Sequence, residues 1–209
     1  MAGDKKGLFV TFEGIDGCGK TTQLNLAARF LADNGHLVRT FREPGSTPVA
    51  EKIRAILLDN ALSMTDATEL FLYEAARADI TANEIAPALQ QGAIVLCDRF
   101  YDSTTAYQGY GRQLDVDMVK SLHRLAVADV VPDLTLVFDL DLKTASTRIG
   151  PAKDRLESES STFHERVRRG FLKIAEAEPS RVKVIDAAPP VDVVFEDVKM
   201  HLLARIDKQ

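Results

Sequence analysis

The residues most able to do chemistry lie together near the start of the chain. They are Gly14, Ile15, Asp16, Gly17, Cys18, Gly19, Lys20, Thr21 and Thr22. They fit the pattern G-x-x-x-x-G-K-[ST], in which glycines let the backbone curl until several N–H groups point at one phosphate. In that pattern the lysine reaches the β- and γ-phosphates, and the first hydroxyl holds Mg²⁺. The segment therefore predicts a site for a nucleoside triphosphate with Mg²⁺.

A strand and a helix should flank this segment if it holds phosphates. Residues 8–12 form a short apolar run that is typical of a buried parallel strand. After the segment, Leu24, Ala27 and Leu31 recur at roughly helical spacing. The start of that helix adds unpaired N–H donors and the positive end of its dipole. The alternative interpretation is a glycine turn beside a surface lysine, and the strand–turn–helix context favours the phosphate site.

A second candidate pair, Asp98 and Arg99, stands at the C-terminal tip of a strand expected over 93–99. Open parallel sheets bind ligands at that edge. A carboxylate after an apolar strand helps to hold Mg²⁺ in nucleotide-binding proteins. Hydrolases usually place Glu next, to activate water, whereas Arg99 suits bidentate phosphate contact and charge neutralisation. A salt bridge at the strand end is the alternative interpretation.

Short apolar stretches alternate with helical patterns along the 209 residues. We expect strands at 8–12, 36–41, 93–99, 134–140 and 182–186, with helices at 51–58, 65–89, 116–128, 144–148, 163–177 and 193–203. Such alternation predicts an α/β fold: a five-stranded, mostly parallel sheet with helices on both faces. No boundary is visible, so we expect one domain spanning residues 1–209.

Composition and charge exclude several function classes. The formal net charge of −5 argues against non-specific nucleic-acid binding. No apolar run approaches the length of a membrane span, and the N-terminus lacks the apolar core of a signal peptide. Cys18 and Cys97 lack metal-ligand spacing and are best interpreted as reduced thiols. We therefore expect a cytoplasmic protein with no nucleic-acid or membrane partner.

Two polar segments are candidates for ligand contact. Residues 102–109 begin with capping residues and continue as a polar, aromatic-bearing turn that Gly109 and Gly111 then break. Residues 150–158 are charged, contain Gly and Pro, and lie between two helices, which suits a mobile lid at about 148–160. A solvated connector is the alternative interpretation of that second segment.

Taken together, these features resemble the bacterial thymidylate kinases, a branch of the nucleoside monophosphate kinases. The resemblance covers nearly the whole chain. It rests on Gly14–Thr22, Arg42-Glu43-Pro44-Gly45, Ala75-Ala76-Arg77, Asp98-Arg99, Asp102-Ser103-Thr104, Ala106-Tyr107-Gln108-Gly109, Pro132-Asp133-Leu134 and Asp154-Arg155-Leu156. It implies the P-loop nucleoside triphosphate hydrolase fold and the reaction ATP + dTMP → ADP + dTDP with Mg²⁺, a step toward dTTP. It also implies a homodimer formed through helices near 65–90 and 115–128.

The resemblance assigns the thymine contacts to five residues. Tyr73 sits where an aromatic ring, usually Phe, stacks on the base. Arg77 donates to O4, Gln108 lies near the base edge, and Thr104 is a further hydrogen-bonding candidate. Pro44 packs near the methyl group, beside Glu43 in the same substrate-binding set.

The resemblance assigns the sugar and phosphate contacts to a second group. Tyr107 crowds the 2′ position and so favours deoxyribose. Asp16 binds the 3′-hydroxyl or, with Thr21 and Asp98, helps to organise Mg²⁺. Arg54 and Arg99 hold the acceptor phosphate. The attacking phosphate oxygen is already ionised, so catalysis needs positioning and charge neutralisation instead of a general base.

The chain departs from the family pattern in two places. Ser46 replaces the second glycine of Glu-Pro-Gly-Gly-Thr, which reduces the freedom of a turn. The P-loop contains no arginine, and family members of this kind usually carry lid arginines that act on the transferring phosphate. The catalytic set is therefore Lys20, Asp16 and Arg99 with the lid candidates Arg148, Lys153 and Arg155.

A thiol hypothesis and three rival functions complete the predictions. If their strands are neighbours, Cys18 and Cys97 both approach the phosphate site. Alkylation of these thiols should then slow the enzyme, and bound ATP should protect them from alkylation. The nearest rival is a kinase for another monophosphate or for a nucleoside, although Arg54 and Arg99 anticipate an acceptor that already carries phosphate. A GTP-dependent switch lacks its Asn-Lys-x-Asp sequence here. A nucleotide-binding protein without catalysis is the third rival.

Overall fold

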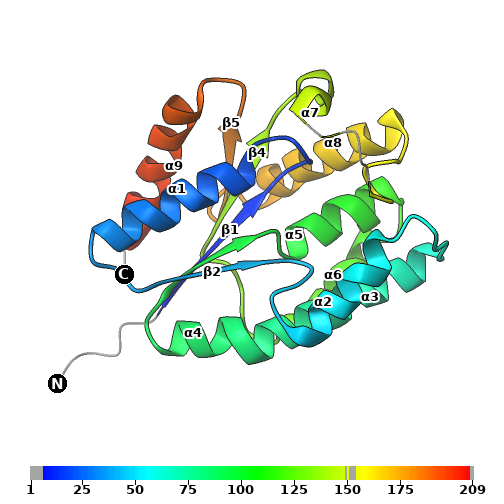
Figure 1. Cartoon of the computed structure of the whole chain (residues 1–209), viewed down its shortest axis with the longest axis horizontal. Helices are drawn as coiled ribbons and strands as arrows, with labels where there is room; N and C mark the ends of the chain where they lie inside the picture. Colours follow the sequence, from blue (N-terminus) through cyan, green and yellow to red (C-terminus); the bar gives the residue numbers. More distant parts are fainter. Residues whose placement is uncertain (1–6, 149, 151–153, 208–209) are drawn as a thin grey trace.

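The computed structural model describes residues 7–148, 150 and 154–207. Within them, five strands form one sheet: β1 (Leu8–Glu13), β2 (Val38–Arg42), β3 (Ile94–Asp98), β4 (Leu134–Asp139) and β5 (Val182–Asp186). The strand order is β2-β3-β1-β4-β5, and every neighbouring pair is parallel. Figure 1 shows this sheet running through the middle of the molecule. The predicted α/β fold is confirmed, with a sheet that is parallel throughout its described strands.

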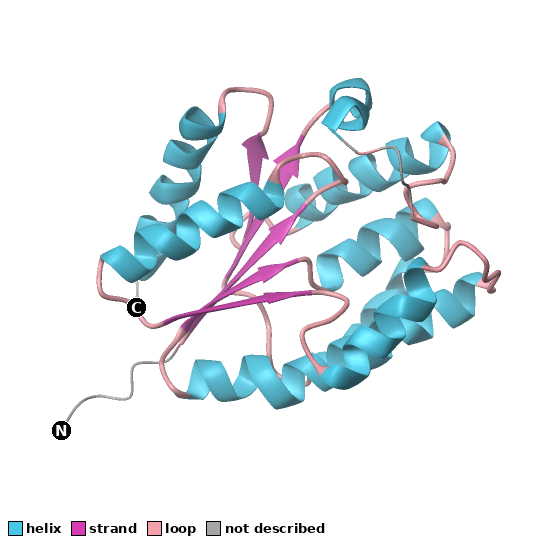
Figure 2. Cartoon of the chain, in the orientation of Figure 1, coloured by secondary structure: helices cyan, strands magenta, loops and turns pink. Residues whose placement is uncertain are grey.

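Helices cover both faces of the sheet (Figure 2). They are α1 (Lys20–Asp33), α2 (Pro48–Leu58), α3 (Asp66–Ile80), α4 (Ala86–Gln90), α5 (Tyr101–Thr104), α6 (Val116–Val127), α7 (Leu142–Arg148), α8 (Ser161–Ala177) and α9 (Val191–Ile206) among the described residues, with the π-helices η1 (Thr81–Ile85) and η2 (Thr105–Gly111). Helices α1 and α9 pack against each other on one face, and α4 and α8 contact the sheet from the other. None of the described helices is both long and apolar enough to cross a membrane.

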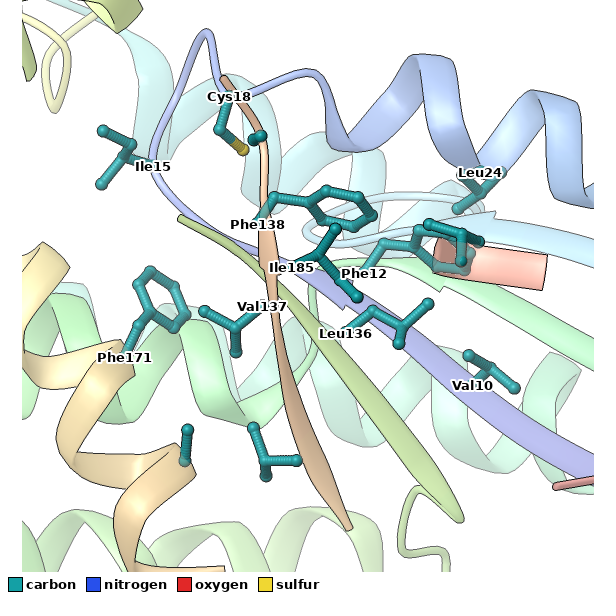
Figure 3. Close-up of a cluster of buried hydrophobic side chains, with 14 of the residues drawn as sticks. Val10, Phe12, Ile15, Cys18, Leu24, Leu136, Val137, Phe138, Phe171 and Ile185 are labelled. Carbon is teal, nitrogen blue, oxygen red and sulfur yellow. The ribbon is translucent and has the colours of Figure 1, made fainter. Parts of the chain in front are cut away.

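The alternation of side chains along β1 explains why both faces are covered. Val10 and Phe12 belong to a cluster that includes Leu24 of α1, part of which Figure 3 shows. Phe9 points to the opposite face of the sheet, where it belongs to a second cluster that includes Val95 of β3. Successive strand residues point to opposite faces, so a strand buried on both sides is apolar almost throughout. The apolar run at 8–12 is therefore explained by its central place in the sheet.

The segment 102–111 corrects one prediction from the sequence. It is not a glycine-broken turn, because α5 continues directly into η2 and buries Tyr107 and Gln108 at 4% and 1% exposure. A Cβ at Gly111 would lie 2.7 Å from the ring of Phe163 on α8. The glycine thus permits close packing of two helical segments at the residue where η2 ends.

Candidate functional site

Two clefts carry the predicted site residues, and the first surrounds the P-loop between β1 and α1. Its lining contains seven predicted residues, which are Gly17, Cys18, Gly19, Lys20, Thr21, Thr22 and Arg148. It also contains Gln23, Val194 and residues 187–191, which the sequence analysis missed. The loop 187–190 follows β5 and leads to Val191 at the start of α9, and the only available signal was its position at the C-terminal end of a strand. We call this the donor cleft.

The glycines of the P-loop do what their spacing predicts. Gly14 has φ +140°, and a Cβ there would lie 2.7 Å from the carbonyl oxygen of Phe138. Gly19 caps α1 with φ +93° and no side-chain hydrogen bond, so the first amides of the helix stay available to a ligand. Lys20 Nζ is 3.5 Å from both the Ile15 carbonyl oxygen and Asp16 Oδ1. These long contacts leave the ammonium group available to phosphates.

Thr21 and Asp98 meet beside the P-loop, although they are 77 residues apart. Thr21 Oγ1 donates to Asp98 Oδ2 at 2.5 Å. The described residues contain no group of three or more His, Cys, Asp or Glu side chains that could hold a metal ion by themselves. Mg²⁺ in phosphoryl-transfer sites is held by one or two protein oxygens together with substrate phosphates and water. A hydroxyl and a carboxylate in contact fit that requirement.

The second cleft lies beside the first and is lined mostly by residues predicted for the acceptor. They are Asp16, Glu43, Pro44, Arg54, Tyr73, Arg99, Tyr107 and Gln108, joined by Leu58, Ser103, Asp154 and Leu156. Burial raises the pKa of Tyr73, so its phenol stays neutral near pH 7. Two predicted residues, Arg77 and Thr104, are not among the lining residues. We call this the acceptor cavity.

Arg99 connects the two clefts. Its guanidinium donates to the Gly14 carbonyl oxygen at 2.9 Å and to Asp16 Oδ1 at 2.6 Å. Tyr107 donates its hydroxyl to Asp16 Oδ2 at 3.2 Å, and the Arg99 guanidinium lies 5.2 Å from the centre of the Tyr107 ring. Burial opposes ionisation of Asp16, but Arg99 and Lys20 lower its pKa well below the usual range. The P-loop and the acceptor cavity therefore share an ionised carboxylate and a guanidinium.

Glu13 supports this junction, and no sequence pattern pointed to it. Its carboxyl Oε1 accepts from the Phe100 amide at 2.7 Å, and its Oε2 lies 2.5 Å from Ser103 Oγ. Ser103 also accepts from Arg99, which has φ +72°, a backbone conformation that non-glycine residues rarely adopt. Burial, with a further contribution from Asp102, raises the pKa of Glu13 to about 8. A buried carboxyl group thus holds a strained loop in place.

Arg77 lies behind the acceptor cavity at 1% exposure. Its guanidinium donates to Glu43 Oε2 at 2.9 Å, to Glu74 Oε1 at 2.8 Å and to Thr104 Oγ1 at 2.9 Å. His123 Nδ1 lies 2.8 Å from the same Glu74 oxygen, so this network reaches α6. Burial raises the pKa of Glu43 to about 7, although Arg77 opposes that rise. The structure thus gives Arg77 internal partners that the sequence did not reveal.

The two lid candidates within the described residues, Arg148 and Arg155, lie in different surroundings. Arg155 donates from Nε to the Leu57 carbonyl oxygen at 3.0 Å, and its NH1 lies 2.5 Å from Glu69 Oε2. Its guanidinium is therefore committed to α2 and α3. Arg148 is exposed and lines the donor cleft. Lys153 lies outside the described residues, so Arg148 is the described lid cation best placed for a phosphate.

The structure separates the two cysteines. Cys18 lines the donor cleft at 2% exposure and packs in the same cluster as Phe12. Cys97 is fully buried in the second cluster, and among the described clefts neither the donor cleft nor the acceptor cavity includes it. Burial raises the pKa of both thiols and disfavours the reactive thiolate. The expectation that both thiols approach the phosphate site is wrong for Cys97.

Comparison with known proteins decides the family. The family model described as thymidylate kinase matches residues 12–198. The chain belongs to the thymidylate kinase family. A thymidylate kinase of Geobacter sulfurreducens is 50% identical over 97% of this chain and 100% of its own length. One from Geotalea daltonii is 47% identical over 96% of this chain and 99% of its own length.

A solved structure agrees with the fold of this thymidylate kinase family member. The crystal structure of thymidylate kinase from Ehrlichia chaffeensis matches with a TM-score of 0.79 and 37% identity. The match covers 94% of this chain and 98% of the other. The five-stranded sheet and its P-loop are thus those of a thymidylate kinase family fold.

The family departure at Ser46 has a local explanation. Ser46 has φ +71°, so the backbone keeps a conformation that glycine adopts more easily. Its amide donates to Glu51 Oε1 at 2.7 Å, and its hydroxyl donates to the Arg42 carbonyl oxygen at 3.1 Å. The hydroxyl hydrogen bond offsets part of the conformational penalty, and Ser46 is not among the residues lining the acceptor cavity.

Proposed function

We propose that this protein transfers the γ-phosphoryl group of ATP to dTMP and releases ADP and dTDP. The observation that carries the proposal is Arg99, which contacts the P-loop carbonyl of Gly14 and also lines the acceptor cavity. A guanidinium at that junction suits two phosphates that must approach each other. Tyr73, Gln108 and Pro44 line the part of the cavity that we assign to the thymine base.

The residues of the chain act by positioning and by neutralising charge. Lys20 and the amides at the start of α1 hold the phosphates of ATP, and Arg148 approaches them from the far side of the donor cleft. Arg54 and Arg99 hold the acceptor phosphate, whose oxygen is already ionised and needs no base. Asp16, which Arg99 keeps ionised, accepts a hydrogen bond from the 3′-hydroxyl of dTMP. Thr21 and Asp98 fit Mg²⁺, which supplies further charge neutralisation at the β- and γ-phosphates when bound.

An acceptor panel tests this function. ADP release is measured with ATP and Mg²⁺ and with dTMP, dUMP, dCMP, dAMP, dGMP or UMP as acceptor, and ³¹P NMR identifies the product. We expect dTMP to give the highest kcat/KM and to yield dTDP. A protein that used dCMP, dAMP, dGMP and UMP as well as dTMP would refute the proposal. Thymidine as the better acceptor would favour a nucleoside kinase.

We also propose that the chain works as a cytoplasmic homodimer, with residues 148–160 as the lid of a single kinase domain. The apolar side chains of Phe71 on α3 and Leu125 on α6 are 59% and 83% exposed, and the two helices are neighbours. Exposed apolar side chains on two neighbouring helices support an interaction surface there. Light scattering should give twice the chain mass for the wild type and less for Leu125→Glu. A wild type that is monomeric at micromolar concentration would contradict the dimer.

A further inference from the structure

Glu69 occupies an unusual place beside the acceptor cavity. It lies on α3, one turn before Tyr73, and its side chain is only 1% exposed. Its Oε1 accepts from Gln108 Nε2 at 2.7 Å and from Arg112 Nε at 3.2 Å. Its Oε2 accepts from Arg112 at 3.1 Å and pairs with Arg155 at 2.5 Å. One buried carboxylate thus joins a cavity-lining amide to the segment at 154–159.

The partners of Glu69 keep its carboxyl group ionised. Burial opposes ionisation, but hydrogen bonds from Arg112 and Gln108 lower its pKa below the ordinary value. Arg112 also pairs with Glu159 at 2.5 Å, so its own position is fixed from two sides. A buried carboxylate that two guanidinium groups hold is ionised at neutral pH and can only accept hydrogen bonds.

That charge determines how the Gln108 amide is turned. Because Glu69 can only accept, the amide must direct its –NH₂ group toward Glu69. Its carbonyl oxygen is then left as an acceptor for a ligand in the cavity that Gln108 lines. The imide N–H at position 3 of thymine can donate to such an acceptor. Cytosine has only a lone pair at position 3, so two acceptors would face each other.

We propose that Glu69 is a positioning residue that sets the polarity of Gln108 and thereby selects a thymine base over cytosine. The proposal rests on the proposed function, because it assumes that the cavity receives the base of a nucleoside monophosphate. Glu69 is not among the cavity-lining residues and acts through Gln108. Arg155 pairs with Glu69 and so helps to hold it in place. This gives Arg155 a role on the acceptor side instead of at the transferring phosphate.

The direct test replaces Glu69 with Gln, whose amide can donate as well as accept. The Gln108 amide is then no longer held in one orientation. We expect the KM for dTMP to rise about tenfold and the preference in kcat/KM for dTMP over dCMP to fall about tenfold. The KM for ATP should stay within about twofold. Glu165→Gln on the exposed face of α8 is the matched control and should leave all three quantities unchanged.

Two further variants separate positioning from a merely structural role. Glu69→Asp keeps the charge between Arg112 and Arg155 but shortens the reach to Gln108, so it should fold and lose part of the preference. Gln108→Met removes the amide, and adding Glu69→Gln to it should lower the preference no further. Circular dichroism and thermal melting check that each variant is folded.

The outcomes are distinguishable. Folded Glu69 variants that keep the wild-type dTMP-to-dCMP ratio would overturn the inference and leave the proposed function intact. Additive losses in the double variant would overturn it as well, because Glu69 would then act by another route than Gln108. A wild type that shows no preference for dTMP would instead refute the proposed function, and with it the basis of this inference.

Discussion

The donor cleft and the acceptor cavity hold their charges in opposite ways. In the donor cleft, Lys20 makes only two 3.5 Å contacts, and Arg148 is exposed. Behind the acceptor cavity, Arg77 is buried and donates to Glu43, Glu74 and Thr104 at 2.9 Å or less. The donor cleft leaves its cations for the ligand to neutralise, whereas the acceptor side neutralises them with its own carboxylates.

The difference lies in how completely each buried cation is paired within the protein, since Lys20 is 7% exposed and Arg77 is 1% exposed. Among the described residues, Lys20 has one ion pair, with Asp16 Oδ1 at 3.5 Å, so bound phosphates can supply most of the charge that neutralises it. A buried guanidinium without partners would be strongly unfavourable, so the acceptor side has to be completed by the protein itself. A loosely held cation suits a step in which charge develops, and a fixed network suits recognition of one base. Substitutions on the two sides should therefore affect different quantities.

The largest expected effect is that of Lys20→Ala. Removing the P-loop cation should lower kcat about a thousandfold, because the lysine neutralises charge on the transferring phosphoryl group. The free energy of unfolding should change by less than about 1 kcal/mol, since the ammonium group makes only long contacts. Steady-state kinetics and chemical denaturation measure the two quantities. A large loss of stability would show that the donor cleft depends on Lys20 for folding.

Arg77→Ala should show the reverse profile. It leaves Glu43 and Glu74 buried without their cation, so the free energy of unfolding should fall by about 3 kcal/mol. Arg77→Lys retains the charge without the planar fork, and we expect a smaller loss of stability with a raised KM for dTMP. Denaturation curves and acceptor kinetics provide the measurements. If Arg77→Ala were as stable as the wild type, the contrast between the two sides would fail.

The pH dependence of stability gives a third test, through Glu13. Its folded-state pKa of about 8 lies above that of an exposed glutamate, so the folded protein holds a proton that the unfolded chain has lost. Stability therefore falls as pH rises from about 5 to about 8, by about 3–4 kcal/mol from this group. Glu13→Gln, which cannot ionise, should give a flatter curve. Parallel curves for the two proteins would contradict the assignment.

The smallest expected effect is that of Ser46→Gly. Glycine relieves the strain of φ +71° but loses the hydroxyl bond to Arg42, and the two changes oppose each other. The free energy of unfolding should stay within about 0.5 kcal/mol of the wild type. Acceptor kinetics should also be unchanged. A marked change in the KM for dTMP would mean that this turn shapes the acceptor cavity.

The contrast also explains what could be predicted from the sequence. The P-loop residues are neighbours in the chain, so their spacing alone is enough to predict their geometry. Asp98 could be placed because it ends an apolar strand, and the structure brings it to Thr21. Local pattern and strand ends were therefore enough for the donor cleft and the order of the elements.

The network around Arg77 could not be predicted in this way. Its partner Glu43 is 34 residues away, and His123 is 49 residues from Glu74. The local sequence pattern does not indicate such partners, because only the packed fold brings them together. The same reason explains why Arg155 was one of three candidates for the transferring phosphate, whereas the structure pairs it with Glu69. The close packing at Gly111 was not predicted because its neighbour, Phe163, lies 52 positions further along.

The most direct test of the completed acceptor cavity is calorimetric binding of dTMP in the absence of ATP and Mg²⁺. A cavity that the protein completes by itself should bind one dTMP per chain under these conditions. It should bind dCMP at least about tenfold more weakly, a difference of about 1.4 kcal/mol. If dTMP bound only after an ATP analogue and Mg²⁺ were added, or if dCMP bound equally well, the acceptor side would not be organised in advance.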